Sequence, residues 1–281
     1  MSVIGRKETT NGVAVDYEVF SSMAELVETC KTRPIKDNDF QDMAKKSYGS
    51  FEGVGSYAEA LDLLRNGWDK YLQATKRAIN DVGKCLYEKR LSFTQGVEGF
   101  MPIVPLALNR VPNAMVTAYY KPMKTRVVRL YFDCGLSAGY DEEEFVRNGQ
   151  NLLKVVTKLE QQGYRVELNV CNCYAGSNDK VKMVVQNVKP ASQLLDLKRV
   201  SFPLMHPAML RVFGFDWYSK FPNTEYFGGY GKPLYNKYGE STGKIYKELF
   251  GDSSVCLAGA EIVEMDEKEI EDLIFKRLEV K

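Results

Sequence analysis

The pattern of apolar and polar residues changes near residue 126, and the second half of the chain carries the clearest signals. A nearly continuous apolar run at 127–132 is typical of a strand inside a parallel sheet. After it, apolar residues recur at helical spacing from Phe145 to Leu159, which predicts a long helix capped by Asp141 and ended by Gly163. Two alternating segments, 165–171 and 180–188, predict the strands of a hairpin.

The rest of this half continues the alternation of strands and helices. Such an order predicts an α/β domain at 126–281, with a mostly parallel, Rossmann-like sheet and helices on both faces, in which the hairpin interrupts the alternation. The further elements expected are a helix at 190–197, a strand at 199–203, a helix opened by His206-Pro207, an aperiodic loop at 221–239, a helix at 241–250, a strand at 254–258 and a helix capped by Asp266.

The first 125 residues predict a different organisation. Residues 1–16 have the composition of a polar leader. Capping boxes at Ser22 and Ser56 begin two helices, the second with a bend or break at Gly67. We therefore expect a mostly helical N-terminal region at 1–100, followed by an extended, proline-containing connection at 101–125.

Composition and charge exclude some classes of protein. The 281 residues carry a formal net charge of +1, without the excess of Lys and Arg that marks a strongly basic nucleic-acid binder. No apolar run is long enough to cross a membrane, and the N-terminus lacks the apolar stretch of a signal peptide. We expect a cytoplasmic protein without membrane partners.

The six cysteines are scattered, and in a reducing compartment they are expected to be free, buried thiols. Only Cys171 and Cys173 lie close together, and strand alternation points both to one face of the sheet. A structural zinc site takes four ligands, usually from two separated pairs, and His206 is the single histidine. Zinc is therefore not favoured.

The turn at 133–137 stands where ligands of α/β sheets bind, outside the carboxyl end of a strand. The Asp133 carboxylate and the Ser137 hydroxyl suit a hard cation such as Mg²⁺ or Mn²⁺. Alternatively Asp133 only caps the turn, or an anion lies at the start of the next helix, although the acidic run 141–144 opposes this. A third interpretation pairs Cys134 as a nucleophile with His206 as its base.

The order of elements in 126–281 resembles the von Willebrand factor A fold, in which a central first strand leads into a long helix and a hairpin forms one edge. The metal site of that family begins with Asp-x-Ser-x-Ser, and residues 133–137 read Asp-Cys-Gly-Leu-Ser. Asp133 and Ser137 match, whereas Gly135 supplies no hydroxyl. The resemblance implies that the hairpin lies at one edge of the sheet and that the metal site is degenerate.

Three segments are similar to an uncharacterised family of proteins from tailed bacteriophages. They are ALDLLRNGW at 60–68, LEQQGYRVEL at 159–168 and FPLMHPAMLR at 202–211. This resemblance implies a viral origin, and with it the cytoplasm of a host cell, but no particular activity.

The loop at 221–239 interleaves aromatic and basic residues, which suits a protein interface or single-stranded nucleic acid. A net charge near zero favours the protein partner. Our leading hypothesis is a non-enzymatic binding or assembly module, which docks a protein, or another copy of itself, above the 133–137 turn. The alternatives are a hydrolase or nucleotide-acting enzyme and a single-stranded nucleic-acid-binding viral regulator. The residues expected to contact a partner are Tyr226, Phe227, Tyr230, Lys232 and Tyr235.

Overall fold

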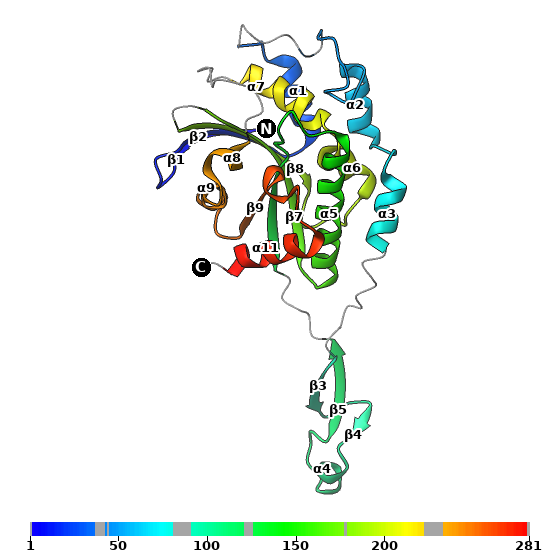
Figure 1. Ribbon diagram of the computed structural model, residues 1–281. Coiled ribbons are helices and arrows are strands. Elements are labelled where there is room, and N and C mark those ends of the chain that lie inside the picture. Colours follow the sequence, from blue (N-terminus) through cyan, green and yellow to red (C-terminus); the bar gives the residue numbers. More distant parts are fainter. Residues whose placement is uncertain are drawn as a thin grey trace.

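The computed structural model describes residues 2–36, 43, 45–80, 91–120, 126–176, 179–221 and 233–279. A six-stranded sheet of order β1-β2-β8-β7-β6-β9 forms the body, and a three-stranded sheet of order β3-β5-β4 lies apart from it (Figure 1). The strands are β1 (Val3–Glu8), β2 (Ala14–Phe20), β3 (Leu91–Gly96), β4 (Met101–Pro102), β5 (Met115–Tyr120), β6 (Val127–Asp133), β7 (Arg165–Ala175), β8 (Lys180–Lys189) and β9 (Ser254–Ala258). The helices are α1 (Met23–Thr32), α2 (Tyr57–Asn66), α3 (Leu72–Asn80), α4 (Val104–Leu108), α5 (Glu142–Gln161), α6 (Leu197–Met205), the π-helix η1 (Met209–Gly214), α7 (Phe215–Lys220), α8 (Leu234–Tyr238), α9 (Ser241–Phe250), α10 (Gly259–Ile262) and α11 (Glu267–Glu279).

The strands of the main sheet do not all run the same way. β2 pairs parallel with β8, and β6 pairs parallel with β7 and β9, whereas β1–β2 and β7–β8 are antiparallel. The predicted α/β class with a mostly parallel sheet is confirmed, although the strand order is not a clean Rossmann or von Willebrand A pattern. As a result, the carboxyl ends of β2 and β8 lie at one end of the sheet, and those of β6, β7 and β9 lie at the other.

The predicted hairpin of β7 and β8 exists, but the expectation that it forms an edge is wrong. β8 pairs on its other side with β2, from Ala14 opposite Lys180 to Phe20 opposite Gln186, and β1 is the edge strand. The hairpin therefore lies inside the sheet.

The prediction of a polar leader at 1–16 is also wrong, because this segment contributes strands to the main sheet. β1 and most of β2 occupy this segment, so the N-terminal region contains strands as well as helices α1 to α3. In β2 the acidic residues Asp16 and Glu18 alternate with Val15 and Val19, and the charges conceal a strand that is covered on both faces. The predicted break at Gly67 is confirmed, since α2 ends there with φ of 81°.

Each face of the main sheet has its own core. On one face, here called the α5 face, Phe132, Val170 and Val184 pack under α1, α2, α5, α6 and α7. On the opposite face, the α9 face, Tyr131 and Met183 pack under α8 and α9. The two groups of helices lie on opposite sides of the sheet in Figure 1. This arrangement agrees with the predicted α/β fold, in which helices cover both faces of the sheet.

The long helix α5 is specified by its own sequence. Asp141 accepts a hydrogen bond from the first turn, and Glu144 reaches back to the backbone N–H of Asp141, so the capping box is complete. Gly163 follows the helix with φ of 90°. Gly149 lets α5 approach α6 closely, because a Cβ there would lie 2.8 Å from the carbonyl oxygen of Leu204.

The segment between β8 and α7 differs from its prediction. The expected helix at 190–197 and strand at 199–203 are wrong, because residues 197–205 form α6, whose first N–H groups are capped by Asp196. The apolar run in 200–205 has the composition of a buried strand, and it is instead a helix buried on nearly all sides. Periodicity alone does not separate these two cases.

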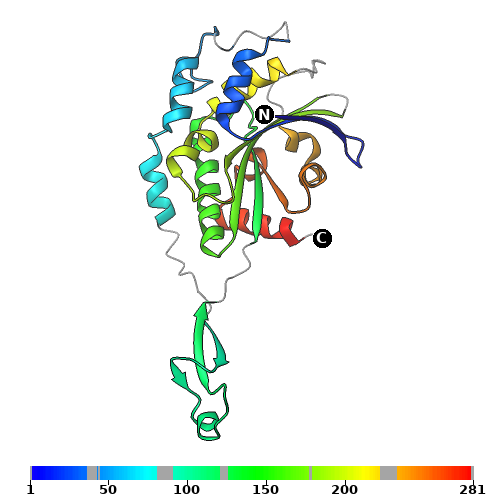
Figure 2. The same cartoon turned by 180° about the vertical axis from the view of Figure 1, so that it is seen from behind.

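The segment 91–120 folds into a unit that we call the arm, made of β3, β5, β4 and α4. Both views show the arm projecting from the body at the end opposite α1 and α2 (Figure 2). The prediction of an extended connection at 101–125 is therefore wrong where the chain is described, because 101–102 and 115–120 are strands and 104–108 is a helix. Among the helices of the described residues, none has the length and hydrophobicity to span a membrane.

Candidate functional site

The predicted site begins at Asp133, the last residue of β6, which pairs with Cys171 of β7 and Ala258 of β9. Its side chain is fully buried, and Oδ1 accepts a hydrogen bond of 3.0 Å from the N–H of Gly135. Burial raises the pKa of Asp133 to about 7, while the N–H groups of Gly135 and Cys173 oppose the shift. Oδ2 is buried without a hydrogen-bond partner among the described residues.

The turn after Asp133 is closed over by neighbouring backbone. A Cβ at Gly135 would lie 3.1 Å from Oδ1 of Asp133, and the Cβ of Pro233, which precedes α8, would be in ordinary contact at 3.5 Å. A Cβ at Gly259 would lie 3.0 Å from the carbonyl oxygen of Asp133. Both glycines therefore leave little room for a side chain beside Asp133.

The structure does not join the two predicted metal ligands. Asp133 is fully buried, whereas Ser137 is exposed and uses its carbonyl to accept a hydrogen bond from the N–H of Tyr140. Within the described ranges, no group of three or more His, Cys, Asp or Glu side chains is arranged to hold a metal ion.

Cys134 points to the α5 face, opposite to Asp133, as strand alternation requires. Its thiol is 3% exposed and donates a hydrogen bond of 2.6 Å to Oδ1 of Asn172. Burial, and then the charge of Asp133, raise the pKa of Cys134 well above its ordinary value. The thiol therefore lacks the depressed pKa of an activated nucleophile.

His206 lies elsewhere, at the C-cap of α6. Its ring contacts Trp68 edge-on at 4.5 Å and stacks on Phe202 at 5.0 Å, and its Nδ1 accepts a hydrogen bond from the N–H of Ala208. Burial lowers the pKa of His206 to about 4, so the imidazole is neutral at pH 7. Neither residue is among the hydrogen-bond or ring partners found for the other, and the structure does not assemble a Cys134–His206 pair.

The other described cysteines are free and buried, as predicted. Cys171 and Cys173 do share one face, and Cys256 joins them under α9. The hydroxyl of Tyr246 lies 2.9 Å from the sulfur of Cys173. Burial raises the pKa of each of these three thiols, which marks a packed core and not a reactive site.

Most of the predicted partner-binding loop lies outside the described residues, including Tyr226, Phe227, Tyr230 and Lys232. Tyr235 is described, half-buried in α8. The same helix is tied to the β7–β8 turn, because Lys237 donates to the carbonyl of Gly176 and pairs with Asp179 at 3.2 Å. The C-terminal part of the predicted loop is thus a helix anchored to the hairpin.

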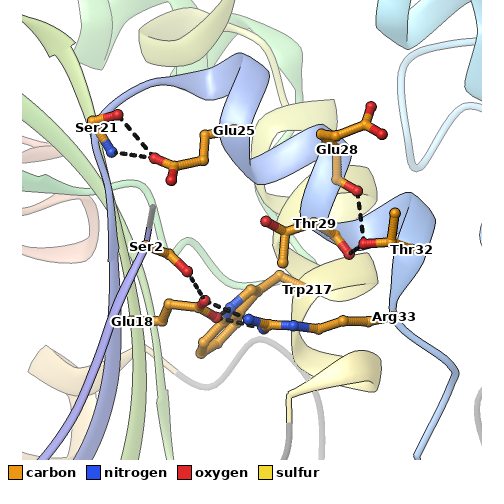
Figure 3. Close-up of polar contacts among 9 residues, drawn as sticks. All are labelled: Ser2, Glu18, Ser21, Glu25, Glu28, Thr29, Thr32, Arg33 and Trp217. Carbon is orange, nitrogen blue, oxygen red and sulfur yellow. Dashed lines mark hydrogen bonds and ion pairs between the residues drawn. The ribbon is translucent and has the colours of Figure 1, made fainter.

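A buried polar cluster around Glu18 was not found from the sequence. Figure 3 shows Ser2, Arg33 and Trp217 meeting the Glu18 carboxylate, which is fully buried. Arg33 donates two hydrogen bonds of 2.6 Å, Ser2 donates one of 2.6 Å, and the indole N–H of Trp217 donates one of 2.8 Å. Burial raises the pKa of Glu18, but these donors outweigh it, and the net pKa is lowered. The cluster joins β2, the end of α1 and α7.

The arm carries most of the exposed apolar surface. Seven of the twelve exposed large apolar side chains among the described residues belong to it, whereas exposed apolar residues are usually scattered singly over a surface. The seven, with their exposed fractions, are Phe93 (60%), Val97 (69%), Phe100 (64%), Met101 (51%), Val104 (58%), Leu108 (79%) and Val111 (39%).

These features define an α/β protein with buried strand ends on its β6 side and an apolar arm inserted between α3 and β6. Residues 7–258 match the model of a family described as a domain of unknown function (DUF7192), and the chain belongs to that family. The match runs from the last two residues of β1 to the end of β9 and includes the arm. No curated protein and no solved structure matches the chain.

Proposed function

We propose that this protein is a non-enzymatic binding or assembly module that contacts a protein partner through its arm, and that a second copy of the chain is such a partner. One observation carries the proposal: the arm exposes seven large apolar side chains, among them Phe93 and Met101 on one face of its sheet. A sheet with one apolar face is stable when another layer buries that face.

The register of the arm strands defines this face. Phe93 lies opposite Ala118, and Met101 lies opposite Val116, so their side chains project from the same side of the sheet. The other side carries Thr94 of β3 and Thr117 of β5, together with Met115. The side of Phe93 and Met101, which also includes Gln95, faces solvent through these two apolar side chains.

The charge of the arm indicates the kind of partner. Residues 91–120 contain one acidic side chain, Glu98, and one basic side chain, Arg110. A nucleic-acid surface is read mainly through Lys and Arg, so this composition favours a neutral, apolar protein surface. The face of a second arm has that chemistry, and face-to-face packing of two copies gives a closed, symmetric contact.

The size of the surface suits such a contact. If each exposed apolar side chain of the arm contributes roughly 80–100 Å², the seven offer on the order of 600 Å² per copy, spread over the sheet face, the turns and α4. Stable interfaces bury about 800 Å² per partner, so the proposed dimer has to use the turns and α4 as well as the sheet face.

The proposal places the contact on the arm in preference to the 133–137 turn, because Asp133 is fully buried and Cys134 nearly so. A hydrolase centred on Cys134 and His206 receives no support from their separate environments. The finer likeness of 126–281 to the von Willebrand A fold and the likeness to a bacteriophage family stay part of the proposal, since assembly of viral particles in a host cytoplasm calls for such modules. We propose no metal, Mg²⁺ or Mn²⁺ included.

Sedimentation velocity across a concentration series tests the proposal. We expect the wild-type protein to form a reversible dimer with a Kd on the order of 1–10 μM. Phe93→Ser with Met101→Ser removes two apolar anchors and should weaken dimerisation at least tenfold. Thr94→Ala with Thr117→Ala, on the opposite side of the same sheet, is the matched control and should leave the Kd unchanged.

Two outcomes contradict the proposal. One is a wild-type protein that stays monomeric to 200 μM, a concentration about twentyfold above the weakest expected Kd. The other is a dimer that the Phe93 and Met101 changes leave intact while circular dichroism shows that the fold is retained.

A further inference from the structure

A cleft of about 760 Å³ lies between one side of α1, the end of α2, the end of β8 and α6. It stands at the carboxyl ends of β2 and β8, two parallel neighbours that lead into α1 and α6. Ligands of α/β sheets bind in such crevices, outside the carboxyl ends of parallel strands. Because the sheet is mixed, this position lies at the opposite end from Asp133.

The wall of the cleft is rich in cations. It contains Lys31, Arg65, Lys198 and Arg199, against the acids Glu28 and Asp196. Asp196 is engaged, because it caps α6 by accepting hydrogen bonds from two backbone N–H groups, whereas Glu28 has a weak pair, 4.0 Å from Lys31. The four cations still outnumber the two acids.

The two arginines remain available to a ligand. Arg65 and Arg199 are exposed, and neither forms an ion pair with any residue in the described ranges. Lys198 has a weak pair, 3.9 Å from an Asp69 that is itself largely exposed. Guanidinium groups at the rim of a cleft are suited to carboxylate and phosphate, which they bind through paired hydrogen bonds.

The lower part of the cleft is apolar. Met23, Val27, Leu64, Val188 and Pro203 line it, and Val27 and Val188 belong to the core of the α5 face. A bare inorganic anion would leave this floor in contact with water, whereas an apolar chain or ring would cover it. The volume falls within the range of sites for small organic ligands.

We propose that this cleft binds an amphiphilic organic anion, whose carboxylate or phosphate meets Arg65 and Arg199 while its apolar part lies on the floor. This inference is independent of the proposed role of the arm, since the cleft and the arm share no residues.

Isothermal titration calorimetry with octyl phosphate, kept below its micelle-forming concentration, is the test. We expect binding at micromolar to low millimolar concentrations, with at least tenfold weaker binding of inorganic phosphate and of octanol. Arg65→Glu with Arg199→Glu should weaken octyl phosphate binding at least tenfold. Octanoate in place of octyl phosphate then identifies which anionic group the site prefers.

Two controls separate the cleft from other effects. Lys244→Glu with Lys268→Glu makes the same change in net charge on α9 and α11, where both lysines are exposed, and should leave the affinity unchanged. Phe93→Ser with Met101→Ser removes apolar surface from the arm and should also leave it unchanged.

The proposal is overturned if octyl phosphate does not bind at millimolar concentration, or if the cleft variant binds as tightly as the charge-matched control. Equal affinity for inorganic phosphate would reduce the cleft to a simple anion site, and equal affinity for octanol would reduce it to an apolar one. Either result also contradicts the proposal.

Discussion

Replacing Glu18 by glutamine removes a buried negative charge whose carboxylate oxygens accept four hydrogen bonds. Glutamine keeps one acceptor oxygen, but its amide NH₂ then faces the guanidinium of Arg33, which donates to both carboxylate oxygens in the wild-type protein. The Arg33 side chain is 22% exposed, so water reaches only part of the stranded charge. The substitution therefore breaks a buried ion pair from one side.

The expected loss of stability follows from this geometry. Removing one partner of a buried ion pair costs about 3–5 kcal/mol, because the other charge is left without compensation. Partial exposure of Arg33 and the retained acceptor for Trp217 place Glu18→Gln at the lower end, about 3 kcal/mol. With a urea m-value of about 3 kcal/mol/M, the unfolding midpoint should fall by about 1 M.

Urea unfolding followed by tryptophan fluorescence measures the effect, since the indole N–H of Trp217 binds Glu18 directly. Glu8→Gln, on the exposed edge strand β1, is the matched control and should be neutral. A double-mutant cycle with Arg33→Met should show that the double variant loses less than the sum of the two single variants. A Glu18→Gln midpoint equal to that of Glu8→Gln would refute the reasoning.

The same cluster predicts a pH dependence with a defined sign. The pKa of Glu18 is lowered below the 4.5 of an unperturbed glutamate. Its contribution to stability is therefore complete above pH 4.5 and is lost as the pH falls through the lower, folded-state pKa. Wild-type protein should lose stability more steeply than Glu18→Gln in that acidic range, as measured by urea unfolding at successive pH values.

Three further predictions concern single sites. His206 is the one histidine, so its NMR resonance is unambiguous, and with a pKa of about 4 it should not titrate between pH 8 and 5.5. The fold should lose about 3 kcal/mol of stability as the pH falls from 6.5 to 4, because the imidazole takes up its proton in the unfolded chain before it does so in the folded protein. Asp133→Asn should increase the free energy of unfolding more at pH 8 than at pH 5, with a gain at pH 8 of at most about 4 kcal/mol, because the wild-type fold loses stability as the pH rises from 3.8 to the folded-state pKa of about 7. Urea unfolding at the two pH values measures it, and an equal gain at both would contradict the burial of Asp133 as an acid. Gly149→Ala should cost about 1–3 kcal/mol in urea unfolding by forcing α5 from α6, whereas Gly139→Ala, where a Cβ meets nothing within 4 Å, should be neutral.

The sequence correctly predicted those elements whose ends are determined by neighbouring residues in the chain. The capping box at Asp141 and the glycine at 163 define α5 without reference to the rest of the molecule. β2 was missed because Glu18 looks like a solvent-facing acid until Arg33 and Trp217, distant in sequence, are placed beside it. Its burial depends on partners that no window of neighbouring residues contains.

The rule that ligands bind at strand ends directed attention to the end of β6 alone. Because β2 was not predicted, β8 was expected to be an edge strand. The sequence therefore did not indicate that the carboxyl ends of β2 and β8 lie at the end of the sheet opposite to that of β6. The cleft beside Ser22 and Asn187 could be located only after the pairing of β2 with β8 was known. A hint was present in Asp16 and Glu18, whose alternation with apolar residues has the period of a strand.

The pairing of β2 with β8 also limits how early the main sheet can form during biosynthesis. Phe20 pairs with Gln186, 166 residues later in the chain (186 minus 20), so this part of the sheet cannot form until β8 has been synthesised. At about 5–20 residues per second, a ribosome takes roughly 10 to 30 seconds to supply the partner strand. During that interval the β1–β2 hairpin has emerged with the apolar side chains of Val15 and Val19 uncovered, while the arm can already form from adjacent residues. The N-terminal strands therefore expose an unpaired edge and apolar side chains until β8 has been synthesised.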